Sequence, residues 1–494
     1  MAKTRRPNIL IFMTDHQRAD TVLPEHPAVT PNLTSFAAQG VTFTKTFCPS
    51  PHCCPSRATF FTGLYPSRHG VWNNIMNGQA LSRGLAPRVR LWSEDLAEAG
   101  YRLAWSGKWH VSLEESPKNR CWQELFVSGN SIDDDRNYWD HYREVARKVG
   151  SASRGEGEIL RPGYGTYKAY GTIAKTDAHD DRVVEEALKA LPEMASGADP
   201  WAMFVGVAGP HDPYMVPQKY VDLYDLADVR LPESYHDDLA DKPRIYRRIR
   251  DKAWGQMTER EVREAIRHFW AYCSYLDELF GKLLAGLEAT GQAKNTLVLY
   301  CADHGDYCGE HGLFAKGILC FQGAYHVPAV VRWPAGIARA GRRVEELISL
   351  ADFGPTFTEL SGKKCDAGLT GRSLVPFFKD TRPEDWRDEI HTQCNGVELY
   401  YTQRSVMTRD FKYVFNGFDE DELYDLRNDP HEMRNLAQEA AFDAVKRDLV
   451  GRLWRFALKE NDSVINSYIT VSLAPWGPAE AFRTVKEGKE QHGV

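Results

Sequence analysis

Short apolar runs alternate along the chain with longer segments of helical periodicity. The runs are rich in β-forming residues and cover positions 9–13, 41–47, 103–105, 202–207, 297–300 and 329–332. Each has the length and composition typical of a buried strand. Strands that alternate with helices predict an α/β fold in which a large mixed, mostly parallel sheet is sandwiched by helices.

The clearest helix begins at the capping box formed by Thr258 and Glu261 and closes at Gly291. Its apolar positions recur three and four residues apart, at 262, 266, 269, 273, 276, 280, 283 and 287. A strand follows at 297–300, and Asp303-His304 comes directly after it. Ligands of open α/β sheets bind beyond the carboxyl ends of strands, and Asp15 and Asp303 both lie at such ends.

The pattern changes after about residue 380, where shorter alternating runs appear at 405–407 and 412–415. A terminal helix is predicted over about 436–458. The chain therefore divides into a main domain over 1–380 and a smaller C-terminal α+β subdomain over 381–494, with a short antiparallel sheet and the terminal helix. Residues 140–180 and 225–258 are polar and are predicted to be insertions that shape a substrate pocket.

Composition narrows the function classes. The 494 residues are 43% apolar, enough for a large core, and the formal net charge is -7. The chain thus lacks the bulk basic character that binds nucleic acid or an anionic membrane, so anion binding must be local. No window approaches a transmembrane helix.

Ten cysteines are about average for this length and include no C-x-x-C pair. A disulfide scaffold is therefore not implied, and the commonest zinc-site patterns are absent. The basic start of the chain leads into a strand-like run rather than a signal peptide. These observations favour a cytoplasmic protein.

The segment around Cys53 carries the most chemical information. Pro55 suits the first turn of a helix, so a helix is predicted to start near Ser56, with Cys53 just ahead of its N-terminus. A helix N-terminus is an anion site. A lone cysteine near such a turn would more often be a buried core residue.

Cys53 is not alone, because the run Cys53-Cys54-Pro55-Ser56-Arg57, followed after four residues by Thr62-Gly63, resembles the signature of the type I sulfatases of the alkaline phosphatase superfamily. The resemblance implies an alkaline phosphatase-like fold, with 1–380 as the catalytic domain. It also implies that a separate maturation enzyme oxidises Cys53 to formylglycine. The hydrate of that aldehyde carries two hydroxyls, one to attack sulfur and one to expel sulfate.

The same resemblance implies one divalent metal ion, held by Asp15, Cys53, Asp303 and His304, and Ca²⁺ is the default for the family. Many sulfatases have a pair of acids where this chain has Asp15-His16. His16 either ligates through nitrogen or only lines the site. Because imidazole suits Mn²⁺ better than Ca²⁺, Mn²⁺ is the alternative ion.

Further motifs occur in the family's order along the chain, up to the stretch 422–430. The resemblance implies that Lys108 and Lys316 bind sulfate, that His110 hydrogen-bonds the formylglycine, and that His211 protonates the leaving alcohol. Arg57 belongs to the signature itself. Residues next to these motifs are candidates for substrate contact, although aromatic residues are more often core: His52, Trp72, Asn74, Trp109, Tyr214, Gln322 and His326.

The resulting hypothesis is a sulfuric ester hydrolase that acts on a small sulfated molecule, such as a sugar sulfate. A homo-oligomer is compatible with the sequence. A phosphonate monoester or phosphodiester hydrolase with the same machinery is the alternative. A catalytically inactive binding protein is a third class, but it would be expected to have lost one of the motif residues, and all are present.

Overall fold

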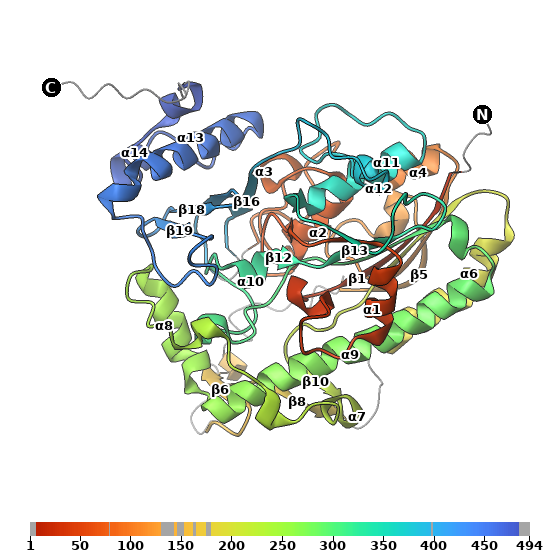
Figure 1. The fold of residues 1–494 in the computed structure, drawn as a ribbon, viewed down its shortest axis with the longest axis horizontal. Helices are drawn as coiled ribbons and strands as arrows, with labels where there is room; N and C mark the ends of the chain where they lie inside the picture. The colour runs from red at the N-terminus through yellow and green to blue at the C-terminus, as the bar shows by residue number, and fades with distance from the viewer. Residues whose placement is uncertain are drawn as a thin grey trace.

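A large mixed sheet forms the centre of the molecule in the computed structural model, which describes residues 6–78, 80–129, 143–145, 153–161, 165–173, 179–396 and 399–483 (Figure 1). Its eight strands, among these residues, run in the order β14-β2-β13-β11-β1-β9-β4-β5. In that order they span Arg342–Val344, Val41–Phe43, Ala329–Arg332, Thr296–Ala302, Asn8–Thr14, Trp201–Gly206, Arg102–Lys108 and Gln123–Ser128.

Most neighbouring strands in this sheet are parallel. β1 pairs in parallel with β11 and β9, and β4 pairs in parallel with β9 and β5. Only β13 runs antiparallel to its two neighbours, β11 and β2. The predicted mixed, mostly parallel α/β sheet is confirmed.

Helices cover both faces of the sheet, because successive side chains of a strand point to opposite faces. Ile9, Ile11 and Met13 of β1 pack in one core with α2 (Cys53–Thr62), α4 (Trp92–Glu98) and α11 (Phe353–Leu360). Leu10 and Phe12 pack in a second core with α1 (Pro31–Ala38), α6 (His179–Ser196) and α9 (Glu259–Ala289). Figure 1 shows the two helical layers above and below the sheet.

The long helix α9 confirms the predicted capping box. The Thr258 hydroxyl accepts from the Glu261 backbone N–H at 3.3 Å, and the Glu261 carboxylate accepts from the Thr258 N–H at 2.8 Å. The helix ends at Ala289, just before Gly291. Its apolar stripe is buried as the spacing predicted.

The strand predicted at 41–47 and the helix predicted to start near Ser56 have other bounds in the structure. The run 41–47 is not one strand, because the Thr44 backbone N–H donates to the Val344 carbonyl and ends β2 there. The rest of the run, β3 (Thr46–Phe47), joins a separate sheet with β12 (His326–Val327) and β15 (Ile348–Ser349). Helix α2 begins at Cys53 and not at Ser56. Pro55 fits within its first turn, where backbone N–H groups have no partner inside the helix.

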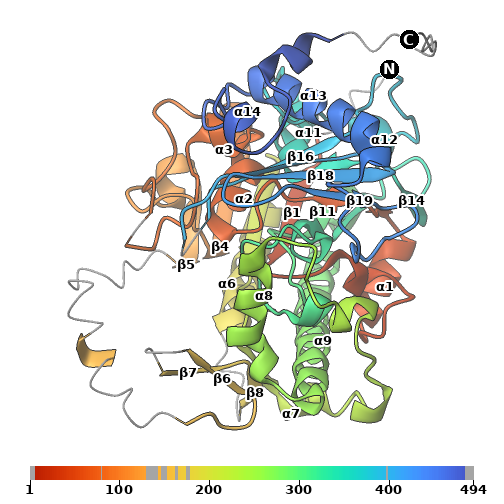
Figure 2. The same cartoon turned by 90° about the vertical axis from the view of Figure 1, so that its left-hand side faces the viewer.

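The C-terminal part contains a four-stranded antiparallel sheet of β16 (Ile390–Cys394), β17 (Gln403–Met407), β18 (Phe411–Asn416) and β19 (Glu422–Asp425). Helix α13 (Asp443–Lys459) lies across it (Figure 2). This helix starts later than predicted, since residues 440–442 form a 3-10 turn. The boundary at residue 380 stays a prediction.

The two predicted insertions contain short elements. In the first, which lies partly outside the described residues, β6 (Glu158–Arg161) and β7 (Gly165–Lys168) form a hairpin, and β8 (Tyr170–Ile173) pairs with β10 (Tyr214–Pro217). The second contains α8 (Arg244–Lys252). Within the described part of the chain, no helix has the length and apolar character needed to span a bilayer.

Candidate active site

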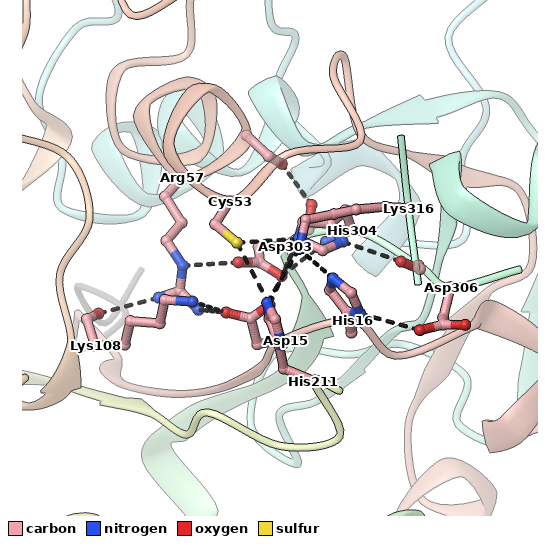
Figure 3. Close-up of polar contacts among 12 residues, drawn as sticks. Asp15, His16, Cys53, Arg57, Lys108, His211, Asp303, His304, Asp306 and Lys316 are labelled. Atoms are coloured by element: carbon pink, nitrogen blue, oxygen red, sulfur yellow. Dashed lines mark hydrogen bonds and ion pairs between the residues drawn. The ribbon is translucent and has the colours of Figure 1, made fainter. Parts of the chain in front are cut away.

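The four strands that carry the predicted motifs lie side by side. The order β11-β1-β9-β4 places Asp303, Asp15, the loop to His211, and Lys108 at the carboxyl ends of adjacent strands. The ladder continues past the strands, because the Asp303 N–H donates to the Thr14 carbonyl and the Asp15 N–H donates to the Gly209 carbonyl. Residues 288 positions apart in sequence therefore share one edge of the sheet (Figure 3).

A pair of glycines lets β4 and β9 meet at this edge. Gly107 has a φ of +109° and lies opposite Gly206. A Cβ atom on Gly107 would stand 1.9 Å from the Gly206 carbonyl oxygen. Only glycine fits there, so the approach of the two strands depends on it, and Lys108 follows directly.

Four of the predicted metal ligands converge. Ligand atoms of Asp15, Cys53, Asp303 and His304 lie within 4.8 Å of one another, and all four residues are buried. His304 donates from Nδ1 to the Gly305 carbonyl at 3.0 Å, so its Nε2 lone pair faces the group. Two carboxylates, an imidazole and the atom at position 53 form a donor set that fits a divalent cation.

Arg57 hydrogen-bonds both carboxylates of this donor set. Its Nε donates to Asp303 Oδ2 at 2.7 Å, its Nη1 to the Lys108 carbonyl at 3.0 Å, and its Nη2 to Asp15 Oδ2 at 3.5 Å. The guanidinium is fully buried and lies on one face of α2, one turn after Cys53. A planar fork of donors suits this task, because it fixes two carboxylates at once.

The thiol of Cys53 sits among positive charges. Its Sγ lies 3.3 Å from His304 Nε2 and 3.7 Å from Asp15 Oδ1. Burial raises the pKa of this thiol, but Lys108, Lys316 and His304 outweigh burial and hold the pKa well below its usual value. For the adjacent Cys54, burial and the neighbouring Cys53 raise the pKa to about 12. The two neighbouring cysteines therefore have opposite electrostatic environments.

Lys108 and His110 flank the thiol. Lys108 forms an ion pair with Asp15, and its pKa is raised because Asp15 and Cys53 outweigh the effect of burial. Burial and Lys108 lower the pKa of the His110 imidazole to about 4, against the opposing effect of neighbouring Cys53. A neutral His110 next to an anionic centre can act as a hydrogen-bond partner.

On the other side, two histidines meet Lys316. Its Nζ contacts His16 Nε2 and lies 3.1 Å from His211 Nε2, and the two imidazoles stack with centroids 4.1 Å apart. His16 Nδ1 lies 3.0 Å from Asp306 Oδ2. His16 is not a member of the four-residue donor set, but with Asp15 and His211 it forms a second group whose ligand atoms lie within 4.8 Å of one another. Its role as a ligand stays a prediction.

The predicted substrate contacts divide into two groups. His52 is the residue directly before α2, and the Asn74 side chain accepts from the Cys54 N–H at 3.1 Å. Half-buried Trp72 lies two residues before Asn74, so these three belong to the surroundings of Cys53. Trp109 is fully buried, and its indole donates to the Glu115 carbonyl. Tyr214 is buried behind His16 and donates to Asp306.

The remaining two lie on the side of the C-terminal sheet. His326 makes a 2.7 Å contact from Nε2 to the Thr44 carbonyl and stacks on Phe47. Gln322 donates its backbone N–H to Glu432 and lines a small cavity beside β16 and β17. Neither contacts a predicted catalytic residue. The side chains of Trp109, Tyr214 and His326 thus have contacts within the fold, and a role of these residues and of Gln322 in substrate binding stays a prediction.

Sequence reasoning missed two carboxylates. Asp306 is fully buried and accepts from His16, from Tyr214, and from the backbone N–H groups of Cys308 and Ala315. Asp212 occupies the variable position of the motif at His211. Asp306 follows Asp303 of the predicted metal motif by only three residues. This closeness in sequence was the signal that could have indicated a role at the site.

Comparison with known proteins decides the family. The Sulfatase family model matches residues 7–363. The chain belongs to the sulfatase family. A second model, described as N-sulphoglucosamine sulphohydrolase, C-terminal, matches residues 309–459. The sulfatase resembles the uncharacterized sulfatase YidJ of Escherichia coli (strain K12), with 30% identity over 96% of this chain and 91% of that protein.

A choline-sulfatase of Rhizobium meliloti (strain 1021) is also 30% identical, over 88% of this sulfatase and 83% of the relative. Among solved structures, the phosphonate monoester hydrolase of Agrobacterium radiobacter superposes with a TM-score of 0.76. It is 23% identical and the match covers 92% of this chain and 96% of that chain. This likeness shows a shared fold.

Proposed function

We propose that this sulfatase hydrolyses the sulfate ester of a sugar or another small organic molecule, with a nucleophile derived from Cys53 and a divalent cation. One observation carries the proposal: Cys53 opens α2 inside a group of metal-ligating side chains, between Lys108 and Lys316. The family model named for N-sulphoglucosamine sulphohydrolase and the choline-sulfatase relative support a small sulfated substrate.

The nucleophile requires a two-electron oxidation of the Cys53 Cβ to an aldehyde, in which the C–S bond breaks, the sulfur leaves as sulfide and an oxygen takes its place. A separate maturation enzyme would supply the oxidant and the oxygen. The hydrated aldehyde supplies one hydroxyl for attack on sulfur and a second for release of sulfate. The cation, Ca²⁺ or Mn²⁺, would be held by Asp15, Asp303, His304 and the oxygen at position 53, and would lower the pKa of that hydroxyl.

The other side chains bind and orient the ester. Lys108 and Lys316 approach from opposite sides and balance the negative charge on the sulfate oxygens. His110 is the residue that would hydrogen-bond the oxidised group at position 53. His211 is the acid for the leaving alcohol. Burial and Lys316 lower its pKa, but Asp212, Cys53 and Asp15 outweigh them, so its net pKa is raised, as protonation near neutral pH requires.

A phosphonate monoester or phosphodiester hydrolase is the second candidate, and His16 is the observation that favours it. An imidazole stands where a second carboxylate would add negative charge, and it faces Lys316. The site therefore repels an additional negative charge on the ester less strongly than a site with a second carboxylate at this position would.

The mass of the peptide that contains Cys53 tests the nucleophile. Protein from the native host is digested, and the expected result is a mass that corresponds to an aldehyde in place of the thiol. Cys54 in the same peptide should stay a thiol. An unmodified Cys53 in protein with measured esterase activity would refute the proposed nucleophile.

Rates on sulfate and phosphate esters of one aryl alcohol test the reaction. Cys53→Ala should abolish both activities, whereas Cys54→Ala, a control in the same helical turn, should retain activity within about fivefold because its thiol carries no charge. A higher kcat/KM for the sulfate ester supports the sulfatase, and the reverse order supports the second candidate. Activity that survives Cys53→Ala would exclude both.

A further inference from the structure

One side chain of the first insertion, Tyr167, contacts the residue next to His211. Tyr167 lies on β7 of the insertion hairpin, and its hydroxyl donates to Asp212 Oδ2. The Arg161 guanidinium lies 4.5 Å from the centre of the Tyr167 ring, and Trp254 packs at its edge, with ring centroids 6.4 Å apart. The ring is thus held on two sides, and the hydroxyl has a defined direction.

Asp212 in turn contacts two imidazoles. Its Oδ1 lies 3.3 Å from His211 Nδ1 and 3.5 Å from His16 Nδ1. His211 Nδ1 also lies 2.6 Å from the Asp212 carbonyl, so this nitrogen carries the proton and donates it. The Nε2 atom of His211 is then the one that faces Lys316 and the ester.

A second pair of the same kind supports His16. Tyr214 donates to Asp306 Oδ2 at 2.8 Å, and the same oxygen lies 3.0 Å from His16 Nδ1. Each imidazole thus has a carboxylate at Nδ1, and each carboxylate has a tyrosine hydroxyl. The pair at His16 is fully buried in the core, while the pair at His211 depends on the insertion hairpin.

We infer that Tyr167 is a positioning residue: through Asp212 it orients the His211 imidazole so that Nε2 faces the leaving-group oxygen. The hairpin β6–β7 is then part of the catalytic apparatus, and not only a wall of the substrate pocket. The inference rests on the proposed function, because His211 is assigned there as the acid. It adds a residue that no motif contains and that lies 44 positions before His211.

Tyr167→Phe removes only the hydroxyl and leaves the ring in place. A leaving group that needs protonation should reveal the loss, because general acid catalysis contributes most where the leaving alcohol is poor. We expect kcat to fall by about 10-fold for phenyl sulfate and by less than about twofold for 4-nitrophenyl sulfate, with little change in KM. A purely structural role would reduce both rates equally.

Tyr170→Phe is the matched control. Tyr170 lies on the next strand, and its buried hydroxyl has no hydrogen-bond partner among the described residues. This variant should keep both rates. Equal losses for the two substrates in Tyr167→Phe would overturn the inference while leaving the proposed function in place, whereas wild-type protein without activity on either ester would count against the function.

Nitrogen NMR of protein labelled with ¹⁵N-histidine tests the inference without any turnover. Histidine tautomers differ in their ring-nitrogen shifts, and His211→Ala assigns the signal. We expect Tyr167→Phe to shift the His211 nitrogens and Tyr170→Phe to leave them unchanged. Identical His211 signals in wild type and Tyr167→Phe would refute the positioning role even if the enzyme were inactive.

Discussion

At the scale of single residues, Arg57 sets the geometry of the two carboxylates that are proposed to bind the cation. It contacts Asp303, Asp15 and the Lys108 carbonyl through three different nitrogens. Carboxylates that are both buried and close together repel each other, and burial together with Asp15 raises the pKa of Asp303. The positively charged guanidinium hydrogen-bonds both carboxylates and so offsets this repulsion.

Arg57→Lys keeps the positive charge but cannot reach three acceptors at once. We expect metal affinity to fall by about 10- to 100-fold, as is usual when a partner of the ligands is lost. The measurement is the shift in melting temperature when Ca²⁺ or Mn²⁺ is titrated into metal-free protein, since a ligand that binds only the folded state stabilises it.

Arg90→Lys is the control for Arg57→Lys, because Arg90 pairs with Asp95 and Glu98 at the surface. Its metal titration should coincide with that of the wild type. A titration of Arg57→Lys that also coincides would show that the guanidinium does not organise the ligands.

Local motifs in the sequence were enough to select residues that the structure brings together at one edge of the sheet. Their orientations could not be predicted in this way. Whether His16 faces the cation or Lys316 depends on Asp306, which is 290 residues away in sequence. The local sequence Thr14-Asp15-His16 does not determine which ring nitrogen of His16 contacts a neighbouring side chain.

At the scale of elements, the close approach of β4 and β9 places Lys108 beside the ends of β1 and β11. Gly107→Ala puts a Cβ against the Gly206 carbonyl oxygen, so the two strands must separate. We expect the free energy of unfolding, measured by urea denaturation, to fall by about 1–3 kcal/mol more than for Gly100→Ala.

Gly100 is a suitable reference for Gly107 because it also has a positive φ, +82°, but nothing lies within 4 Å of an added Cβ. Both variants add a Cβ at a residue with a positive φ, and only Gly107→Ala also adds the clash with the Gly206 carbonyl oxygen. Equal losses of stability in the two variants would show that the strands adjust at no cost.

The elements that the sequence predicted well are those with strong local signals. Helix α9 combines a capping box with a regular apolar stripe. The run 41–47 offered no glycine or proline at its break, and the contact that turns it, from Thr44 to Val344, joins residues 300 positions apart. The strand order was equally inaccessible, since it is set by long-range pairing and not by local pattern.

At the scale of the whole molecule, the C-terminal sheet belongs to two cores at once. Val406, Tyr413 and Leu423 pack under α13, while Met407 and Tyr424 pack into the core of the catalytic domain. The alternation along each strand divides these side chains between the two faces. A sheet that is shared in this way couples the stability of the two parts.

We therefore expect calorimetry of the metal-loaded protein to show a single cooperative unfolding transition. Met407→Asp would bury a carboxylate in the shared core and should lower the temperature of the whole transition. Arg409→Ala is the control, because Arg409 lies two residues further along and is half exposed. Two separate transitions in the wild type would show that the subdomain unfolds independently.

Cys53 is 2% exposed in the finished fold, at the start of a fully buried helix. A maturation enzyme that must take this thiol into its own active site could do so only before α2 closes over it. Oxidation and folding would then compete in time, from the moment the motif leaves the ribosome. The strand that carries Asp303 is synthesised about 250 residues later. If Cys53 is oxidised as proposed, this delay is the interval in which its thiol is accessible to the maturation enzyme, so the order of the motifs along the chain limits when the oxidation can take place.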